Sequence, residues 1–279
     1  MMPARQAIVA EIVTESQLMN AVAINNFGMN FNRFIMPAAA GFMVEAFDFA
    51  ATYYFMTALY LLGATAVWFL PLTSTISLKG RGALADVKEG IKYVRHETTI
   101  MLILVVTLFA VFFSMPYMML LPIFTVDILK VGAGGMGVLI SVSGIGAMIG
   151  SVILASLPNK RRGALLMMGS LLLGLALVGF SVSTSWHLSL IMIAFVGLGQ
   201  AVRMTLGNAL LQHYVEDEYR GRVMAIYMME FGLTSFGVFF AGVMSDVIGV
   251  QWSVGGLAVL LVIMCIGVLA FSPRMRRLD

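Results

Sequence analysis

The chain has 279 residues, of which 60% are hydrophobic and only 11% charged, with a net charge of +3 at pH 7. A soluble globular domain carries about 25% charged residues, so this composition excludes an ordinary soluble enzyme and predicts an all-α polytopic membrane protein. The basic residues lie in short segments between apolar runs, which gives no reason to expect a nucleic-acid partner. The chain has a single cysteine, Cys265, which excludes an intramolecular disulfide and suggests no metal cluster.

The first segment of the chain is repeated 202 residues later. Residues 4–26 and 206–228 share an apolar run, an acidic break and a second apolar run. Internal repeats in a membrane chain are typical of transporters built from two related halves. A long apolar stretch precedes the second copy but not the first, so we expect the front of the first half to be lacking. The identical positions are Ala7, Val13, Ala23 and Ile24, which match Ala209, Val215, Ala225 and Ile226.

Eight apolar segments are long enough to cross a bilayer, which requires roughly 20 residues each. Of the 17 Lys and Arg residues, 14 lie in the termini and in alternate connections, and therefore on one side of the membrane. Lys130 lies on the other side, and Arg33 and Arg203 lie inside spans. The positive-inside rule then predicts that both termini are cytoplasmic. The expected spans are residues 17–44, 49–70, 99–128, 136–157, 164–183, 187–213, 222–248 and 252–272.

One sizeable polar segment, residues 71–98, divides the chain. We expect residues 1–70 to be the remnant of a first half, residues 71–98 to be a cytoplasmic linker, and residues 99–279 to form a second half of six helices. Within the linker, apolar residues at helical spacing, including Ile91 and Val94, predict an amphipathic helix. This helix either lies on the membrane surface or is a solvated linker helix.

A polar face is predicted on the first span, where Asn26, Asn30, Arg33 and Pro37 recur at helical spacing. Ionisable groups inside spans are costly and usually face a cavity or a partner. This face either lines a water-filled pathway for a polar or anionic substrate or forms hydrogen bonds between helices.

The sixth span carries a second polar face, with Gln200 and Arg203 one turn apart and Asn208 nearby. We interpret these residues as cavity-lining. The two intramembrane arginines, Arg33 and Arg203, outnumber the one intramembrane glutamate, Glu230, which favours an anionic substrate.

Glu230 shares a face of the seventh span with Tyr227, which is a further candidate for the cavity wall. A carboxylate within a span can couple proton entry to export. The alternative is a structural ion pair between Glu230 and either Arg203 or Arg33.

Two prolines, Pro116 and Pro122, flank the cavity candidate Tyr117 in the third span. Proline removes a backbone hydrogen bond, so the span is expected to contain a hinge, a site wall or a fixed kink. In the fourth span, Gly146 and Gly150 form a small-xxx-small pair that permits close helix approach.

Signatures of soluble enzymes are lacking in the sequence. There is no nucleotide-binding Walker loop, and the GAGGMG segment at residues 132–137 follows no strand. We therefore expect neither enzymatic activity nor a cofactor or metal, with a proton gradient as the energy source.

Several segments resemble the major facilitator superfamily, in particular its bacterial exporters of siderophores and macrolides. NAVAINNFGMNFNRFIMPAAAG at 20–41, MPYMMLLPIF at 115–124 and LLQHYVEDEYRGRVMAIY at 210–227 are similar to its helices 5, 7 and 10–11. The resemblance implies twelve helices that work by alternating access, of which this chain holds the equivalents of helices 5–12. It also implies an inner-membrane location and a cytoplasmic gate formed by Arg161, Arg162, Asp217, Arg220 and Arg222.

The sequence therefore predicts a secondary exporter, energised by protons, for a small molecule such as a drug or a siderophore. Its partners would be the lipid bilayer and the substrate. The equivalents of helices 1–4 would come from upstream sequence or a partner chain. The alternatives are a membrane scaffold subunit that needs a partner and a non-functional fragment.

Overall fold

The computed structural model describes residues 15–68, 83–157, 160–216 and 218–278, and within them the side chains of residues 15–34, 67 and 83–88 are left undescribed. All regular elements of this described part are helices, which confirms the predicted all-α class. They are α2 (Glu15–Trp68), α3 (Ala83–His96), α4 (Thr98–Ser114), α5 (Pro116–Ile123), the π-helix η1 (Phe124–Ile128), α6 (Gly132–Ser156), α7 (Arg162–Val182), α8 (Trp186–Tyr214), α9 (Arg220–Ile248), α10 (Val250–Phe271) and α11 (Pro273–Arg276).

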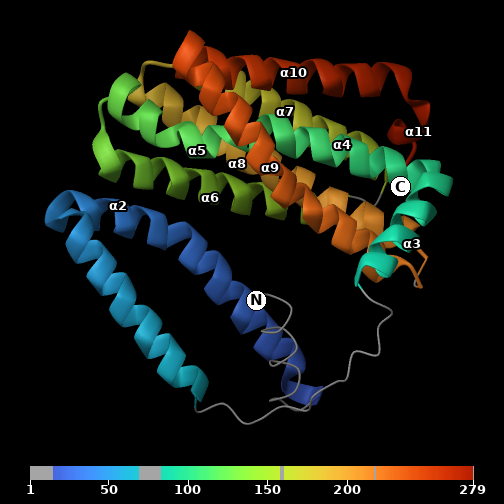
Figure 1. The fold of residues 1–279 in the computed structure, drawn as a ribbon, viewed down its shortest axis with the longest axis horizontal. Coiled ribbons are helices and arrows are strands. Elements are labelled where there is room, and N and C mark those ends of the chain that lie inside the picture. Colours follow the sequence, from blue (N-terminus) through green and yellow to red (C-terminus); the bar gives the residue numbers. More distant parts are fainter. Residues whose placement is uncertain (1–14, 69–82, 158–159, 217, 279) are drawn as a thin grey trace.

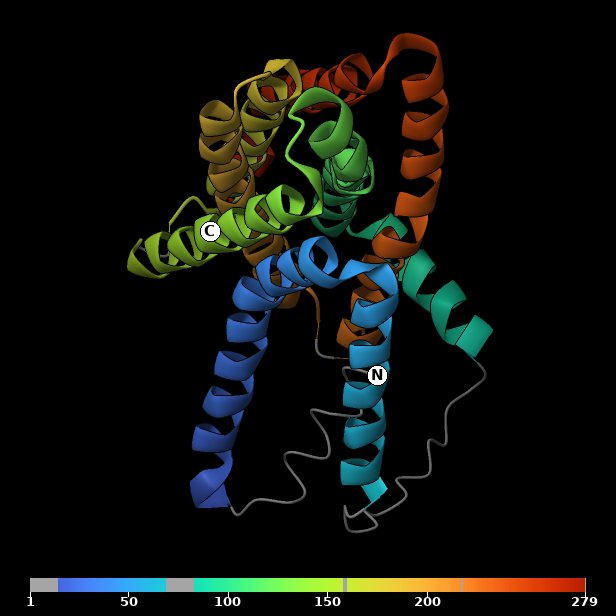
Figure 2. The same ribbon diagram turned by 90° about the vertical axis from the view of Figure 1, so that its left-hand side faces the viewer.

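Helix α2 is a hairpin of two arms that meet at Asp48. The backbone of Asp48 leaves the helical region, with φ 82° and ψ 174°. Its carboxylate accepts a hydrogen bond from the amide of Ala51 at 2.9 Å, so it caps the second arm. Figure 2 shows the two arms running side by side from this reversal. The expected spans 17–44 and 49–70 correspond to these arms.

Seven helical stretches in the described residues are long and apolar enough to span a membrane, one fewer than the eight expected. The difference lies in α2, where the stretch Ile35–Ala66 begins at the first described side chain and continues past the reversal at Asp48. Two helices separated at Asp48, with no intervening loop, thus stand where the two spans are expected.

The third expected span is broken by its prolines into α4, α5 and η1. Pro116 begins α5 and cannot donate to the carbonyl of Phe112, four residues earlier. Gly237 of α9 lies against this carbonyl, since a Cβ there would be 2.8 Å from the Phe112 oxygen. After Pro122 the chain widens into the π-helix, where Leu129 donates to the carbonyl of Phe124 at 2.9 Å. The prediction of a break is confirmed, and α9 packs directly against it.

Close backbone contacts at glycine join α6 to its neighbours. A Cβ on Gly146 would overlap the carbonyl of Ala194 in α8, and a Cβ on Gly150 would lie 2.8 Å from the carbonyl of Leu198. The small-xxx-small spacing therefore serves the α6–α8 contact, as expected. On its other side α6 meets α2, where the Cα of Gly137 would lie 3.1 Å from a Cβ on Gly41.

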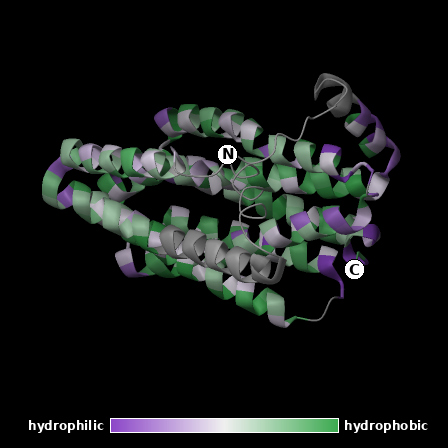
Figure 3. Ribbon diagram, turned by 90° about the horizontal axis from the view of Figure 1, so that it is seen from below, coloured by the Kyte–Doolittle hydropathy of each residue, from purple (hydrophilic) through white to green (hydrophobic). Residues whose placement is uncertain are grey.

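The charged ends of the helices gather at one end of the molecule. Figure 1 places α3, α11 and the C-terminus at one end of the bundle, and the α5–α6 connection that contains Lys130 at the other. Figure 3 shows hydrophilic residues concentrated near α3 and the C-terminus. The amide of Gly163, at the start of α7, donates to the carbonyl of Leu278 at 3.0 Å, which fixes the C-terminal segment there.

The linker helix α3 packs onto α9 and α4. Tyr93 stacks on Tyr219, with ring centroids 4.2 Å apart, and Glu89 pairs with Arg222 at 3.4 Å. Val94 is buried in this contact, whereas Ile91 is 43% exposed. The helix is thus docked on α4 and α9, and its position on the membrane surface or in solvent stays a prediction. Leu84 and Val87 lie among the residues whose side chains are left undescribed.

Candidate functional site

A cluster of buried polar side chains lies where α4, α8 and α9 meet. Arg203 of α8, Tyr227 and Glu230 of α9, and Thr107 of α4 are exposed by only 1%, 1%, 4% and 0% of their surface, respectively. Their surroundings are apolar, with Ile103, Leu206 and Leu210 among the core residues packed in the same region. We refer to Thr107, Arg203, Tyr227 and Glu230 as the polar cluster.

Gly207 allows the three helices to approach one another here. It follows Arg203 by one turn of α8, and a Cβ at this position would lie 3.0 Å from Cγ2 of Thr107 and 3.4 Å from the hydroxyl of Tyr227. A larger residue would push α4 or α9 away. Arg203 and Gly207, one helical turn apart, thus lie on the side of α8 that meets Thr107 and Tyr227.

Glu230 is held by α4. Its Oε1 accepts a hydrogen bond from the hydroxyl of Thr107 at 2.6 Å, a short distance typical of a charged acceptor. Its Oε2 has no hydrogen-bond partner within the described part of the chain. Thr107 thus positions one carboxylate oxygen, while the other has no hydrogen bond within the described part.

Arg203 lies within electrostatic range of Tyr227 and Glu230. None of its three guanidinium nitrogens has a hydrogen-bond partner among the described residues. The described part of the chain therefore shows no direct ion pair or hydrogen bond between Arg203 and Glu230, and the predicted pairing stays a prediction. An unbonded buried guanidinium is costly, and the nearby carboxylate offsets part of that cost.

Protonation of Glu230 changes the charge of the polar cluster. With Arg203 charged, an ionised Glu230 makes the cluster neutral, and a protonated Glu230 leaves it with one positive charge. In surroundings of low dielectric constant, a change of one charge alters interactions with any nearby anion strongly. The arrangement can therefore link proton binding to the binding of a charged or polar solute.

The remaining cavity candidates in the second half lie apart from the cluster or at its edge. Gln200 and Asn208 are partly exposed on α8, and Asn208 accepts a hydrogen bond from the side chain of Gln212. Tyr117 is buried in α5 and lines a pocket that α5 forms with α6 and α8. The structure thus brings together Arg203, Tyr227 and Glu230 and leaves Tyr117 in a different pocket.

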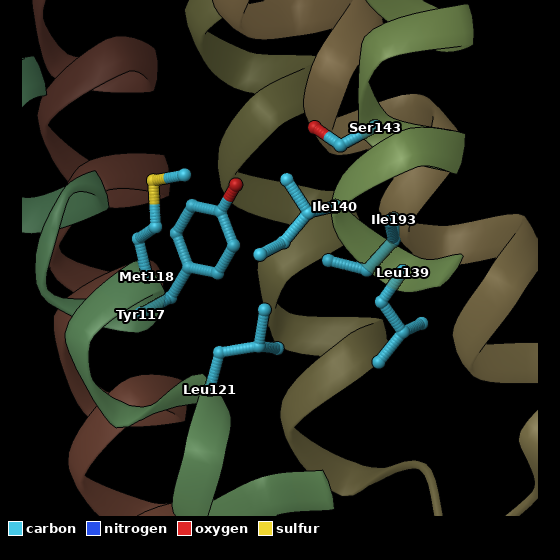
Figure 4. Close-up of a pocket in the computed structure, with 7 residues that line it drawn as sticks. All are labelled: Tyr117, Met118, Leu121, Leu139, Ile140, Ser143 and Ile193. Carbon is cyan, nitrogen blue, oxygen red and sulfur yellow. The ribbon is translucent and has the colours of Figure 1, made fainter. Parts of the chain in front are cut away.

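The pocket at Tyr117 has room for one water molecule at most. Its interior is about 10 Å³, whereas sites for drug-sized ligands measure roughly 300–1,000 Å³. Figure 4 shows the Tyr117 ring entering from α5, with its hydroxyl directed toward Ile140 and Ser143 of α6. In this conformation the pocket is a gap in helix packing and not a substrate chamber.

The three predicted residues of the first span, Asn26, Asn30 and Arg33, belong to the first arm of α2, and their side chains lie outside the described part. The same helix carries Pro37 and Gly41 into the contact with α6, since the carbonyl of Pro37 lies 2.5 Å from a Cβ placed on Gly137.

The predicted gate residues are placed around the ends of α7 and α9. Arg161 precedes α7 in a left-handed conformation with φ 54°, and Arg162 begins that helix. Arg220 begins α9, and Arg222 contacts Glu89 of α3. Asp217 lies outside the described residues. A contact between the α7 and α9 groups is not described, so the gate stays a prediction.

Thr107 is the one member of the polar cluster that was not predicted from the sequence. One signal could have found it, because Thr107 is the only polar residue between Ile100 and Phe113, in the middle of an apolar helix. Among the described residues, no group of three or more His, Cys, Asp or Glu side chains could hold a metal ion.

Comparison with known proteins identifies the family. A family model described as transmembrane secretion effector matches residues 1–279. The staphyloferrin A transporter of Staphylococcus aureus is 25% identical over 266 residues, which cover 94% of this chain and 66% of that protein. Macrolide efflux protein A of Streptococcus pyogenes is 24% identical over 281 residues, which cover 94% and 67%.

Macrolide efflux protein A of Enterococcus faecalis is 24% identical over 238 residues, which cover 80% of this chain and 71% of that protein. The chain thus spans about two thirds of the length of the curated relatives it matches. Its long apolar helices and these similarities both indicate a membrane protein. The chain belongs to the transmembrane secretion effector family and is a multi-pass membrane protein of the major facilitator superfamily.

Proposed function

We propose that the chain is the transporting part of a proton-coupled exporter of small molecules that works by alternating access. The observation that carries this proposal is the polar cluster, with a carboxylate that has one unbonded oxygen beside a buried arginine. Buried charges are costly inside a membrane bundle, so their presence favours a functional role. Proton exchange at Glu230 and the fixed charge of Arg203 are the two parts that such coupling requires.

The proposed substrate is a small organic molecule that carries an anionic or strongly polar group. Arg203 supplies a buried positive charge that no described residue satisfies by hydrogen bonding. The relatives' names, a staphyloferrin A transporter and a macrolide efflux protein, support the export of a siderophore or a drug. The macrolide and the siderophore are therefore the first two probes to test.

Alternating access is supported by the contacts that surround α6 and α4. Helices that meet through glycine have smooth surfaces and can shift with little steric resistance. The α2–α6 and α6–α8 contacts are of this kind. The break between α4 and α5 supplies a point at which the span can bend. We infer that α2 moves relative to α6 as the pathway opens to either side.

We propose an inner-membrane location, with α3 and α11 on the cytoplasmic side. Hydrophilic residues cluster at that end (Figure 3), and the arginines Arg220 and Arg222 of α9 and Arg274 and Arg276 of α11 support this orientation. A membrane-impermeant thiol reagent should label a cysteine introduced at Lys160 from the cytoplasmic side only. Labelling from the outside would reverse the proposed orientation.

Four further helices are proposed to complete the transporter, either encoded upstream or supplied by a second chain. The exposed apolar side chains of α9, such as Phe236 at 60% and Phe239 at 66%, offer a surface for them. Crosslinking from a photoreactive residue at Phe236 in the native cell tests this. A crosslink to protein supports the proposal, and a crosslink to lipid alone contradicts it.

The export proposal is tested by whole-cell accumulation of a labelled macrolide and a labelled siderophore. The gene is altered at its native locus, so the protein is studied at its natural length. Glu230→Gln should raise accumulation of the transported probe to the level seen when a protonophore is added to wild-type cells. Gln keeps the size of the side chain and one acceptor oxygen for Thr107, while it removes the titration.

The control for this experiment is Asp246→Asn, which removes an exposed carboxylate of the same helix, α9. It should leave accumulation unchanged. Equal accumulation in wild type and Glu230→Gln, at equal protein levels, would contradict proton coupling through Glu230.

A further inference from the structure

The hydroxyl of Thr107 has more hydrogen-bond acceptors within reach than it can serve. It lies 2.9 Å from the carbonyl oxygen of Ile103, 3.1 Å from that of Leu104 and 2.6 Å from Oε1 of Glu230. A threonine hydroxyl has one proton to donate and two lone pairs with which to accept. Its proton therefore goes mainly either to Glu230 or to the backbone of its own helix.

The state of Glu230 decides between these partners. An ionised carboxylate can only accept, so Thr107 must then donate to it. A carboxyl protonated on Oε1 instead donates its proton to the Thr107 oxygen, which frees the hydroxyl proton for the carbonyl of Ile103 or Leu104. The only net change between the two states is the proton bound to Glu230.

We propose that Thr107 is a positioning residue that transmits the protonation state of Glu230 to α4 by reversing the direction of this hydrogen bond. A threonine that bonds to a carbonyl of the preceding turn bends its helix slightly. α4 ends seven residues later at Ser114, next to Pro116, and a small bend is carried toward that break. This inference rests on the proposed function, in which Glu230 exchanges protons.

The other groups around Glu230 do not offer this connection. Arg203 of α8 and Tyr227 of α9 are the charged or titratable side chains that act on it electrostatically. α4 contains no ionisable residue, α10 contains only Cys265, and α5 only Tyr117. In α3, Glu89 is paired with Arg222. Thr107 is thus the hydrogen-bond partner of Glu230 that lies on the broken span.

The inference is tested by infrared spectroscopy of the purified full chain in lipid nanodiscs. The carboxyl C=O band that appears on acidification and disappears in Glu230→Gln reports protonated Glu230. Its pH midpoint is compared in wild type, Thr107→Ser, which keeps the hydroxyl, and Thr107→Val, which replaces it with a methyl group of equal size. A hydrogen bond to a charged group stabilises that group by about 1.5–3 kcal/mol. A change of about 1.4 kcal/mol shifts the proton concentration at the titration midpoint tenfold.

In Thr107→Ser, Glu230 should titrate as in wild type. In Thr107→Val, the proton concentration at the Glu230 midpoint should differ by about tenfold or more. The C=O band of protonated Glu230 should also lie at a different frequency in Thr107→Val. Identical titration and band position in wild type and Thr107→Val would overturn the inference. If Thr107→Val does not fold, Thr107→Ala replaces it with the same two outcomes.

The second reading is the amide-I band of the Ile103 carbonyl, which is labelled with ¹³C so that its band is resolved. On acidification this band should shift in wild type and in Thr107→Ser, because the hydroxyl proton moves toward the backbone carbonyls. Absence of the shift in wild type would also overturn the inference. Neither reading measures transport. Failure of the export proposal is therefore recognised separately, when wild-type and Glu230→Gln cells accumulate the labelled probe equally.

Discussion

At the scale of single residues, the polar cluster has two explanations, a function in proton-coupled transport and a role in stability. Arg203 has no hydrogen-bond partner among the described residues, and Glu230 has one bonded and one unbonded oxygen. A structural ion pair usually satisfies both partners through direct hydrogen bonds. The sequence could predict that Arg203 and Glu230 are intramembrane charges, but it could not predict how they face each other, because helix rotation depends on packing at Gly207.

The double substitution Arg203→Met and Glu230→Leu separates the two explanations. Replacing a buried charge pair with hydrophobic residues of similar volume is often neutral or stabilising by about 1–4 kcal/mol. The double variant should therefore melt at the same temperature as wild type or higher, while proton-dependent export is lost. Tryptophan fluorescence of the purified chain during heating measures the first effect, and probe accumulation measures the second.

Arg203→Met alone is the matched comparison, because it leaves Glu230 without its positive neighbour. It should melt below the double variant. A double variant that melts well below wild type would assign the pair a structural role and contradict the functional explanation.

At the scale of helices, the sequence predicted the boundaries more reliably than the contacts. The proline break in the third span and the close approach at Gly146 follow from residue chemistry and were confirmed. The docking of α3 could not be predicted, because Tyr93 stacks on Tyr219, 126 positions later, and no local pattern connects them. The loop-free reversal between the two arms of α2 likewise depends on the backbone and the capping contact of Asp48, which no apolar pattern indicates.

Gly146→Ala tests the α6–α8 contact. A Cβ at this position would overlap the Ala194 carbonyl, which is backbone and cannot rotate away. We expect a loss of about 1–3 kcal/mol or more in stability, the range for overpacked cores. The loss is measured as a lower melting temperature in size-exclusion chromatography of heated samples.

Gly256→Ala is the matched control, because a Cβ on Gly256 of α10 has no heavy atom within 4 Å. It should melt like wild type or slightly higher, since alanine favours helix over glycine by about 1 kcal/mol. Equal melting of both variants would contradict the described packing of α6 against α8.

At the scale of the whole molecule, composition alone established the membrane class, and the seven candidate spans agree with it. The polar faces predicted on α8 and α9 meet at one cluster, so helical periodicity found much of the site in the second half. Periodicity could not supply Thr107, because a single hydroxyl in an apolar helix has no pattern. The substrate is likewise not encoded in any local motif, since it is selected by the combined surface of several helices.

The central claim, that this chain exchanges protons for a small molecule through Glu230, is tested most directly in inside-out membrane vesicles. Respiration acidifies the vesicle interior, and an acridine dye reports the pH gradient by fluorescence quenching. Adding the transported macrolide or siderophore should reverse the quenching in wild-type vesicles, because each entering molecule releases protons. Vesicles with Glu230→Gln at the same protein level should stay quenched. Equal reversal in both, or none in wild type with a probe that the cells export, would contradict the account.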